Sequence, residues 1–588
     1  MTDCDIVIRG GTIVDGSGGD PYVADVGIRD GVVTVIGRVQ GDAAEVIDAT
    51  GKLVTPGFVD VHTHYDGQAI WSDRLDPSSS HGVTTVVMGN CGVGFAPCRQ
   101  EDHELLVSVM EGVEDIPEVV MTEGLSWNWE TFPQYLDALE ARPRDIDVAA
   151  FLPHSPLRVY VMGERGANRE TATSEDLAEM QRLVGEAIDA GALGFATSRV
   201  FFHRRRDGAL IPSVESNWSE LFAIGDAMAR KGAGQLQIVT NVGEGVYDEE
   251  IAMLAEFAEK TGRPVTFTLA QTNSDRDAWR RALAAVESAK AKGSRLIPQI
   301  FPRPVGMIMG LGTSVNPFIL CPTFRDELAG LPLNEKVLRM RDAAVRDKLL
   351  NETPDEEGMP LLQMARSWDL TFPLQSPLDY EPSRERSIEA LAAKAGVTSP
   401  EYMYDALLGD DGHAKFLMAV ANYAEKSLDV VLEIMRHPDA ILGLGDGGAH
   451  YGVICDASYP TFVLSHWTRD RNGEKLSVPE AVAALSRKPA EAARLLDRGL
   501  LKEGYKADIN VIDYDRLQLG MPYVVRDLPG GGKRLMQDAT GYVATIVSGK
   551  IIQRNGKPND ALPGRLVRGA QALRGKPEPM GEDANLIA

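Results

Sequence analysis

Nine residues, Pro56-Gly57-Phe58-Val59-Asp60-Val61-His62-Thr63-His64, decide how this chain is expected to fold. They form an apolar run that ends in polar side chains, and alternate side chains of a β-strand point to the same face. Asp60, His62 and His64 therefore share one face at the carboxyl end of a strand. Two neutral imidazoles on one face can hold a borderline metal such as zinc. The alternative is a pair of histidines that are satisfied by hydrogen bonds and bind nothing.

Seven further apolar runs predict the rest of the fold. The full set spans 53–61, 83–89, 146–152, 191–197, 235–240, 264–270, 295–301 and 440–445. Amphipathic helical patterns separate several of these runs. In residues 174–190, for example, Ser174 is the expected cap and Gly191 the expected end. Buried strands that alternate with helices favour the α/β class, and we expect residues 56–499 to form a TIM-like (β/α)₈ barrel.

Both ends of the chain carry short strand patterns, which we expect to form one small β-sandwich domain from residues 1–55 and 500–558. An Asp-Gly pair between apolar runs, at Asp30-Gly31, is typical of a hairpin. The long gap at 302–439, between the seventh and eighth runs, is expected to be a helical insertion. It would lie at the catalytic mouth, because loops that follow barrel strands line that mouth. There it would shape the substrate pocket or a subunit interface. Residues 559–588 are expected to be an extended tail.

The composition of the chain restricts the classes of molecule that it is expected to bind. The chain has 588 residues and a net charge of -25, which disfavours nucleic acid and anionic membranes as partners and favours solubility. The partner that we expect is a small-molecule substrate. Its apolar content of 44% is ordinary, so the acidic balance does not indicate disorder. Five scattered cysteines make no disulfide framework, and no signal peptide or membrane span is evident. We therefore expect a cytoplasmic enzyme, and the acidic surface is compatible with a homo-oligomer.

The eighth run ends at Asp446. In a closed barrel the last strand lies beside the first, so this carboxylate is expected to meet His62 and His64. It can bind the same metal and act as general base towards a metal-activated water, because a metal lowers the pKa of that water. The alternative is an aspartate that caps the next helix.

Five other residues follow strand ends and are candidates for the site. Cys91 can offer a soft thiolate ligand, or it is a small core cysteine. His154 can stabilise an oxyanion, or it supports other groups and packs. Arg199 and His203 can supply positive charge to a substrate, or they belong to a solvated loop. His450, just past Asp446, can line the pocket.

These motifs together resemble the N-acyl-D-amino-acid deacylases, a branch of the amidohydrolase superfamily. The resemblance rests on PGFVDVHTHYD at 56–66, GVTTVVMGNCG at 82–92, HSPLRVYVMG at 154–163, the terminal Asp446 and KADINVIDYD at 506–515. It covers most of residues 1–301 and 440–555. It implies a zinc-containing (β/α)₈ barrel that hydrolyses amides, with His62, His64 and Asp446 at one metal position. It also implies that Cys91, in place of the carboxylated lysine of other branches, belongs to a second position beside the first.

The sequence departs from this branch at the fifth and sixth runs, which should each supply a histidine to the second position. Asn241 stands after the fifth run, and Leu269 lies in a sixth run without any histidine. We therefore expect one zinc per chain, with a second ion possible, and the ligand types do not exclude manganese or iron. The branch also carries basic residues after those histidines, which hold the substrate carboxylate. Here Asn241 is a candidate substrate contact instead.

Three functions remain open on the sequence. The first is a metal-dependent hydrolase that cleaves a linear amide (C–N) bond, deacylase-like, with Asp446 as general base and His154 at the oxyanion. The second is a hydrolase of a different amide, a cyclic amide or a lactone that lacks a free carboxylate. The third is a catalytically inactive barrel that acts as a binding scaffold.

Overall fold

Each of the eight predicted apolar runs contains a β-strand. Strands from successive runs pair with each other, and each of these pairs is parallel. The computed structural model describes residues 4–243, 245–355 and 360–572. One sheet joins β6 (Phe58–Asp60), β7 (Val83–Met88) and β8 (Asp147–Ala150). A second joins β9 (Leu152–Pro153), β10 (Phe195–Ser198), β11 (Leu236–Val239), β12 (Val265–Thr268), β13 (Leu296–Ile300) and β17 (Ile441–Leu442).

Two sets of contacts connect these sheets. β8 and β9 are successive parts of one run and are separated by the buried Phe151. At the other side, the segment after β17 reaches the segment after β6. The backbone N–H of His64 donates to the carbonyl of Gly447 (2.8 Å), and that of Asp446 donates to the carbonyl of His62 (3.1 Å). The first and last strands of the parallel order therefore end side by side.

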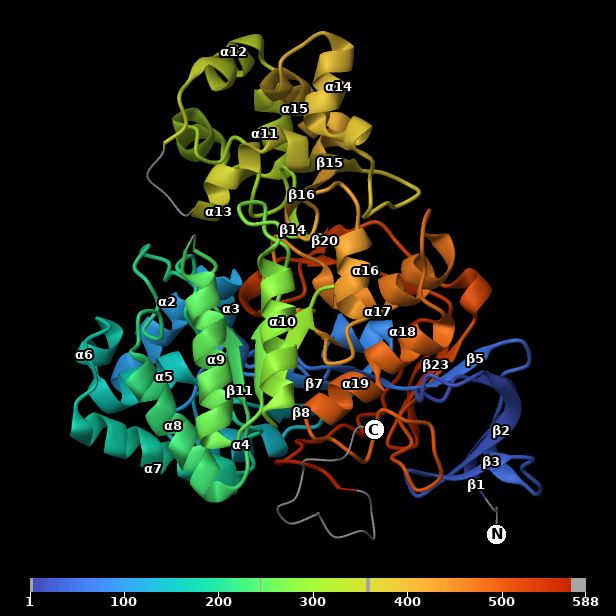
Figure 1. The fold of residues 1–588 in the computed structure, drawn as a ribbon. Helices are drawn as coiled ribbons and strands as arrows, with labels where there is room; N and C mark the ends of the chain where they lie inside the picture. Colours follow the sequence, from blue (N-terminus) through green and yellow to red (C-terminus); the bar gives the residue numbers. More distant parts are fainter. Residues whose placement is uncertain (1–3, 244, 356–359, 573–588) are drawn as a thin grey trace.

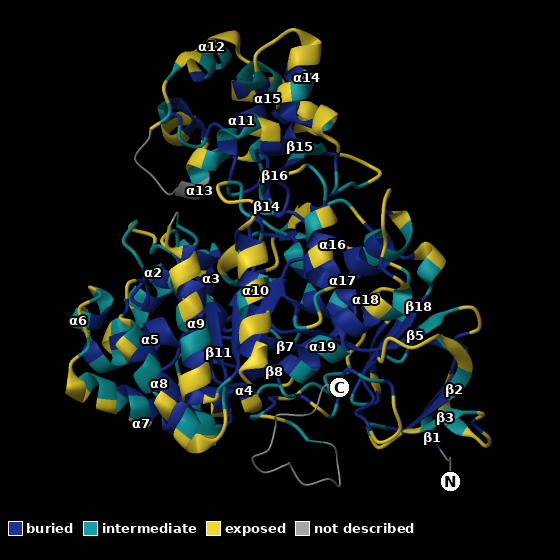
Figure 2. Ribbon diagram, in the orientation of Figure 1, coloured by how far each residue is buried: buried dark blue, intermediate teal, exposed yellow. Residues whose placement is uncertain are grey.

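Long helices cover the outside of these strands. The largest are α7 (Ser174–Ala190), α8 (Trp218–Lys231), α9 (Tyr247–Thr261) and α10 (Ala278–Ala291). Figure 2 shows α9 and α10 with exposed outer faces and buried strands behind them. Helix α7 ends at Gly191 as expected, but its cap is Thr173, which forms a capping box with Asp176, and not Ser174.

Shorter helices fill the connections. They are α1 (Gln68–Trp71), α2 (His103–Glu114), α3 (Glu118–Gly124), α4 (Phe132–Glu140), α5 (His154–Met162), α6 (Glu164–Ala167), α16 (Asp429–Met435), α17 (Tyr459–Phe462), α18 (Val478–Leu485) and α19 (Arg487–Ala492).

The two ends of the chain share one nine-stranded sheet. The N-terminal strands are β1 (Cys4–Ile13), β2 (Tyr22–Arg29), β3 (Val32–Gly37), β4 (Ala43–Asp48) and β5 (Leu53–Pro56). The C-terminal strands are β18 (Ile509–Ile512), β23 (Tyr542–Val547), β24 (Lys550–Arg554) and β25 (Lys557–Pro558). β5 pairs antiparallel with β18, so the run predicted at 53–61 divides at Gly57 and serves two sheets. Two short hairpin pairs, β19 (Gln518–Leu519) with β22 (Ala539–Thr540) and β20 (Tyr523–Val525) with β21 (Arg534–Met536), lie between the C-terminal strands along the chain.

The insertion at 302–439 is a lobe that contains a sheet as well as helices. Figure 1 shows it above the strand layer, in green to orange. Its sheet joins β14 (Val305–Met309), β16 (Lys415–Ala421) and β15 (Thr371–Leu374) in antiparallel pairs, which the helical prediction missed. Its helices are α11 (Leu333–Met340), α12 (Ala343–Asn351), α13 (Pro360–Gln363), α14 (Ile388–Ala395) and α15 (Ser399–Leu407). A separate apolar core holds the lobe and includes Val453 of the segment that follows Asp446.

Residues 559–572 do not extend freely. Val567 N–H donates to the carbonyl of Val148 in β8 (2.7 Å), and Leu566 and Val567 are buried. The remainder of the predicted tail, 573–588, lies outside the described residues. In the part of the chain that the structure describes, no helix is long and apolar enough to cross a membrane.

Candidate metal centre

Four side chains bring potential ligand atoms together where β6, β7 and β17 end. The Nε2 atoms of His62 and His64 each lie 3.6 Å from Asp446 Oδ1. Cys91 Sγ lies 3.4 Å from His62 Nε2 and 3.8 Å from His64 Nε2. Tetrahedral zinc with bonds of about 2.0–2.3 Å separates neighbouring ligand atoms by roughly 3.3–3.8 Å. The spacings of Asp446 Oδ1 and of Cys91 Sγ to the two Nε2 atoms are close to four edges of such a tetrahedron.

Cys91 therefore lies against the two histidines of the first position, whereas the resemblance assigned it to a neighbouring one. Among the described residues, the ligand atoms of His62, His64 and Cys91 all lie within 4.8 Å of one another, in a group that does not include Asp446. Cys91 reaches them from a tight turn in which its own φ is +56°. Its backbone N–H donates to Gln237 Oε1 (3.0 Å), and Asn90 Nδ2 donates to the carbonyls of Thr63 and Val87. These bonds attach the turn to the strands on either side.

Hydrogen bonds from neighbouring groups orient the His62 side chain, and close backbone packing fixes the position of Asp446. His62 Nδ1 lies 2.8 Å from Gln299 Oε1, an acceptor, so this nitrogen carries the proton and Nε2 presents its lone pair. Asp60 Oδ1 accepts the N–H of His62 (3.1 Å). A Cβ at Gly445 would lie 2.1 Å from Asp60 Oδ2, so only glycine fits directly before Asp446. Asp60 therefore contacts both the backbone of His62 and the glycine that precedes Asp446, and it holds the two ligand-bearing segments together.

The site combines neutral imidazoles with buried acidic groups, an environment that favours binding of a cation. Burial lowers the pKa of His62 to about 4 and that of His64 to about 3, which keeps both imidazoles neutral, the form that binds metals. Burial, followed by the charges of Glu114 and Asp446, raises the pKa of Cys91 well above its usual range. Asp446 Oδ1 is buried without a hydrogen-bond partner among the described residues. An unpaired buried oxygen of this kind needs an explanation, and a positive ion supplies one.

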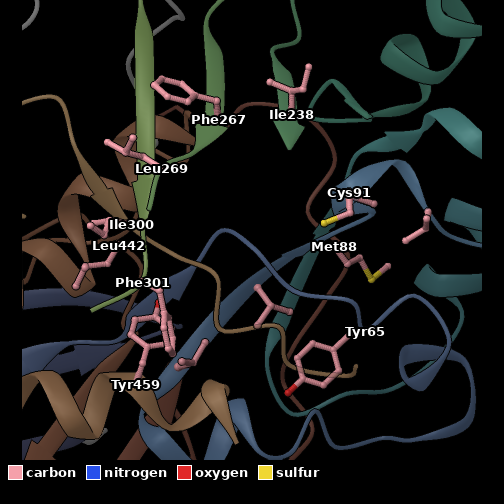
Figure 3. Packing of buried hydrophobic residues seen from close by; sticks show 14 of the residues in the cluster. Tyr65, Met88, Cys91, Ile238, Phe267, Leu269, Ile300, Phe301, Leu442 and Tyr459 are labelled. Carbon is pink, nitrogen blue, oxygen red and sulfur yellow. The ribbon is translucent and has the colours of Figure 1, made fainter. Parts of the chain in front are cut away.

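The fifth and sixth strands supply no ligand to this centre. Asn241 Oδ1 accepts the N–H of Gly243 (3.0 Å), so the amide is engaged in its own turn. Leu269 is fully buried, and Figure 3 shows it in apolar packing with Phe267, Ile300 and Leu442. The end of the fifth strand therefore presents an amide that is already engaged, and the end of the sixth presents an apolar side chain.

Two other candidates are engaged elsewhere. His154 has both ring nitrogens in hydrogen bonds, Nδ1 with Thr197 Oγ1 (2.8 Å) and Nε2 with Glu220 Oε1 (2.6 Å), so neither is available to an oxyanion. Arg199 donates from Nε to both oxygens of Glu250 (2.9 Å), and its side chain is 14% exposed. The sequence could not reveal these partners, because each lies 43 or more residues away along the chain.

Two further histidines were candidate substrate contacts, and burial keeps His203 neutral, so it does not supply the positive charge that was expected of it. His450 Nε2 lies 3.3 Å from Glu114 Oε2, and its side chain is 29% exposed. Burial, followed by neighbouring imidazoles including His450 and His64, lowers the pKa of His203 to about 3. His203 Nδ1 has no hydrogen-bond partner among the described residues. Glu114 itself was missed, and its only sequence cue is a charged residue beside the apolar Val113 in a helical pattern.

Comparisons with known proteins identify the family of this chain. The model of the amidohydrolase family matches residues 45–553. An N-acyl-D-glutamate deacylase of Alcaligenes xylosoxydans xylosoxydans is 26% identical over 587 residues, which cover 98% of each chain. A D-aminoacylase of the same organism is 36% identical over 198 residues, which cover 34% of this chain and 38% of that protein.

Solved structures share the fold. A D-aminoacylase crystal structure has a TM-score of 0.63 at 22% identity and covers 96% of this chain and 100% of its own. The N-acyl-D-glutamate deacylase of Bordetella bronchiseptica, complexed with zinc and a phosphonate inhibitor, has a TM-score of 0.62 at 23% identity, with 96% and 99% covered. The chain belongs to the amidohydrolase family, in its D-aminoacylase-like branch. It is a metal-dependent hydrolase that acts on carbon–nitrogen bonds other than peptide bonds.

Proposed function

We propose that this enzyme cleaves a linear amide, as an N-acyl-D-amino-acid deacylase does, at a single metal ion held by His62, His64, Asp446 and Cys91. The observation that carries the proposal is the convergence of two Nε2 atoms on an Oδ1 that has no hydrogen bond, at 3.6 Å each. Zinc is the preferred ion, because two imidazoles, a carboxylate and a thiolate are its usual ligand types. We further infer that the parallel strands close into a (β/α)₈ barrel with the 302–439 lobe over its mouth.

Because four side chains would fill a tetrahedron, an ion held here would need to accept water as a fifth ligand, and it would then supply activation of that water and polarisation of the substrate carbonyl. The chain's own contribution is the carboxylate of Asp446, whose side chain is 21% exposed and so reaches the open side of the site. As general base, Asp446 accepts a proton from the attacking water and then passes it to the leaving nitrogen. His203 and His450 are the proposed contacts to the substrate. His154 is not carried forward as an oxyanion donor, because both of its nitrogens are engaged.

One ion per chain is supported by what surrounds the centre. A second ion would need further ligands from the fifth and sixth strands, where Asn241 is engaged in a turn and Leu269 offers none. A solved D-aminoacylase with a TM-score of 0.63 has a binuclear metal centre with one-metal activation and second-metal attenuation. A single-ion centre in the present chain is compatible with that behaviour.

The second candidate function is hydrolysis of a substrate that has no free carboxylate. The pairing of Arg199 with Glu250 favours it. Arg199, the basic residue proposed for substrate binding, is paired with Glu250, which is itself buried. No basic side chain replaces it at Asn241 or Leu269. A neutral linear amide, a cyclic amide or a lactone therefore fits the pocket better than an acyl amino acid in this respect. A cytoplasmic location and a homo-oligomer stay predictions of the sequence.

Metal content per chain, measured by plasma mass spectrometry on protein purified without a His-tag, tests the proposal. We expect about one zinc in the wild type and none in the His62→Ala/His64→Ala double variant. His413→Ala, which removes an exposed histidine of the insertion, is the matched control and should keep its zinc. About two ions in the wild type would contradict the single-ion centre, and none would favour the binding scaffold.

Activity then separates the substrate classes. Acylated D-amino acids and neutral amides of matched acyl length are compared on zinc-loaded enzyme. A preference for the acylated D-amino acids would support the deacylase, and a preference for neutral amides would support the second candidate.

A further inference from the structure

Glu114 is a buried carboxylate beside the metal centre that the proposed reaction does not use. It ends helix α2, its side chain is 1% exposed, and it faces two histidines at once. Oε1 lies 3.4 Å from Nδ1 of His64, and Oε2 lies 3.3 Å from Nε2 of His450. Neither oxygen completes a hydrogen bond to any described residue. Isolated buried carboxylates are costly, so a carboxylate in this place needs partners.

The surrounding backbone holds Glu114 in this place. The N–H of His450 donates to the carbonyl of Glu114, which joins the end of α2 to the segment after Asp446. The next residue, Asp115, has a φ of +50°, and its Oδ2 accepts the N–H of Gly452 (2.9 Å). The carbonyl of Gly452 in turn accepts the N–H of Ser314 in the insertion lobe (3.0 Å). A Cβ at Gly452 would lie 1.7 Å from Ser314 Oγ, so only glycine fits at position 452. At this point the end of α2, the segment after Asp446 and the insertion lobe are in close contact.

The chemistry of a metal-bound imidazole explains what Glu114 does there. When Nε2 binds a metal, Nδ1 carries the proton and needs an acceptor. His62 has such an acceptor in Gln299, at 2.8 Å. His64 Nδ1 has no hydrogen-bond partner among the described residues, and Glu114 Oε1 is the carboxylate oxygen that lies near it. A movement of a few tenths of an ångström would complete that bond, and contacts of this kind are often long in the absence of ligand.

We propose that Glu114 is a positioning residue, which fixes the Nδ1–H form of His64 so that Nε2 faces the metal and which holds His450 at the open side of the site. The proposal rests on the metal centre proposed above. Glu114 acts through these two histidines and touches neither the substrate nor the ion. It connects the ligand set to the segment that the insertion lobe packs against, so α2 and the lobe both stabilise the geometry of the centre.

Zinc affinity of Glu114→Leu, measured by competition with a chromophoric chelator, tests this role. Leu has a similar size but removes both oxygens that face the imidazoles, so we expect the Kd for zinc to rise 10- to 100-fold. Glu114→Gln keeps one acceptor oxygen for His64, as Gln299 does for His62, and should bind zinc more tightly than Glu114→Leu. The absorption spectrum of cobalt(II)-substituted Glu114→Leu should also change, because His64 is no longer held in one orientation. The control is Glu111→Leu, three residues earlier on the same helix, where the carboxylate pairs with Arg206 at the surface and its loss should leave both readouts unchanged.

Melting temperatures with and without zinc separate positioning from a purely structural role. If Glu114 only stabilises the fold, Glu114→Leu lowers both temperatures equally and leaves the Kd for zinc unchanged, which would overturn the proposal. If it positions His64, the gain in melting temperature on adding zinc becomes smaller. A wild type that binds no zinc would remove the metal centre itself, and the inference with it, and this result is distinguishable because it needs no variant.

Discussion

Replacing Cys91 with alanine tests the ligand set most directly, because the structure and the resemblance disagree about this residue. In the structure Sγ lies 3.4 and 3.8 Å from the two imidazoles that would hold the same ion. Alanine removes the sulfur and keeps the backbone, whose left-handed φ of +56° costs a cysteine and an alanine alike. The side chain is 7% exposed, so its loss leaves a small cavity worth about 1 kcal/mol, which a protein of this size tolerates.

The expected loss of affinity follows from the number of ligands. Apparent zinc-binding free energies of four-ligand structural sites are about 10–16 kcal/mol, or about 2.5–4 kcal/mol for each ligand. Since 1.4 kcal/mol is a factor of ten, Cys91→Ala should raise the Kd for zinc roughly 100- to 1,000-fold. The cobalt(II)-substituted wild type should show a thiolate-to-metal charge-transfer band in the near ultraviolet, and the variant should lack it.

Cys98→Ala is the matched control, because Cys98 is also buried and its Sγ donates to a backbone carbonyl, that of Arg99. It should keep the wild-type Kd and the charge-transfer band. If Cys91→Ala binds one zinc as tightly as the wild type, the reasoning fails. In that case His62, His64 and Asp446 alone hold the ion, and Cys91 belongs to a separate position.

Three further outcomes are expected. Asp446→Asn should lower kcat about 10²- to 10⁴-fold on any accepted substrate because it removes the general base, and equal kcat in steady-state assays would refute that role. Burial alone would raise the pKa of Glu381, but hydrogen bonds from His466 and Arg471 lower it to about 2. Its stabilising effect is therefore full above its ordinary pKa and is lost as pH falls towards 2, so the stability difference between Glu381→Gln and wild type should shrink as denaturation is measured at pH 5, 4 and 3. Arg199→Ala should destabilise the fold by about 3–5 kcal/mol, since it leaves Glu250 buried and unpaired, and should leave KM unchanged in the folded fraction. A raised KM at unchanged stability would restore Arg199 as a substrate contact.

The parallel order of strands was predictable because it depends on local pattern. Each apolar run is long enough to be a buried strand, and the helices between them show a period of 3.6 residues. The insertion was predicted less well, because β14, β15 and β16 come from segments more than 40 residues apart and pair antiparallel within a helical lobe. Non-local pairing of that kind leaves little trace in any short window.

Part of the centre was equally predictable. His62 and His64 share a face because a strand has a period of two, and Asp446 ends the last strand of the order. In contrast, His154 and Arg199 were chosen for their position after strands. Their engagement with Glu220 and Glu250 depends on where α8 and α9 pack, which no motif in the sequence specifies.

The class of fold, the chemical types of the ligands and the absence of histidines on the fifth and sixth strands could all be read from the amino-acid sequence. These follow from residue identity and from periodicities that span a few residues. Only the tertiary structure decided that Cys91 faces both histidines, that Arg199 is already paired and that Glu114 lies between His64 and His450. Such contacts join residues from different strand ends and helices, and their distances are set by how the connecting turns close and how the helices pack on the strands.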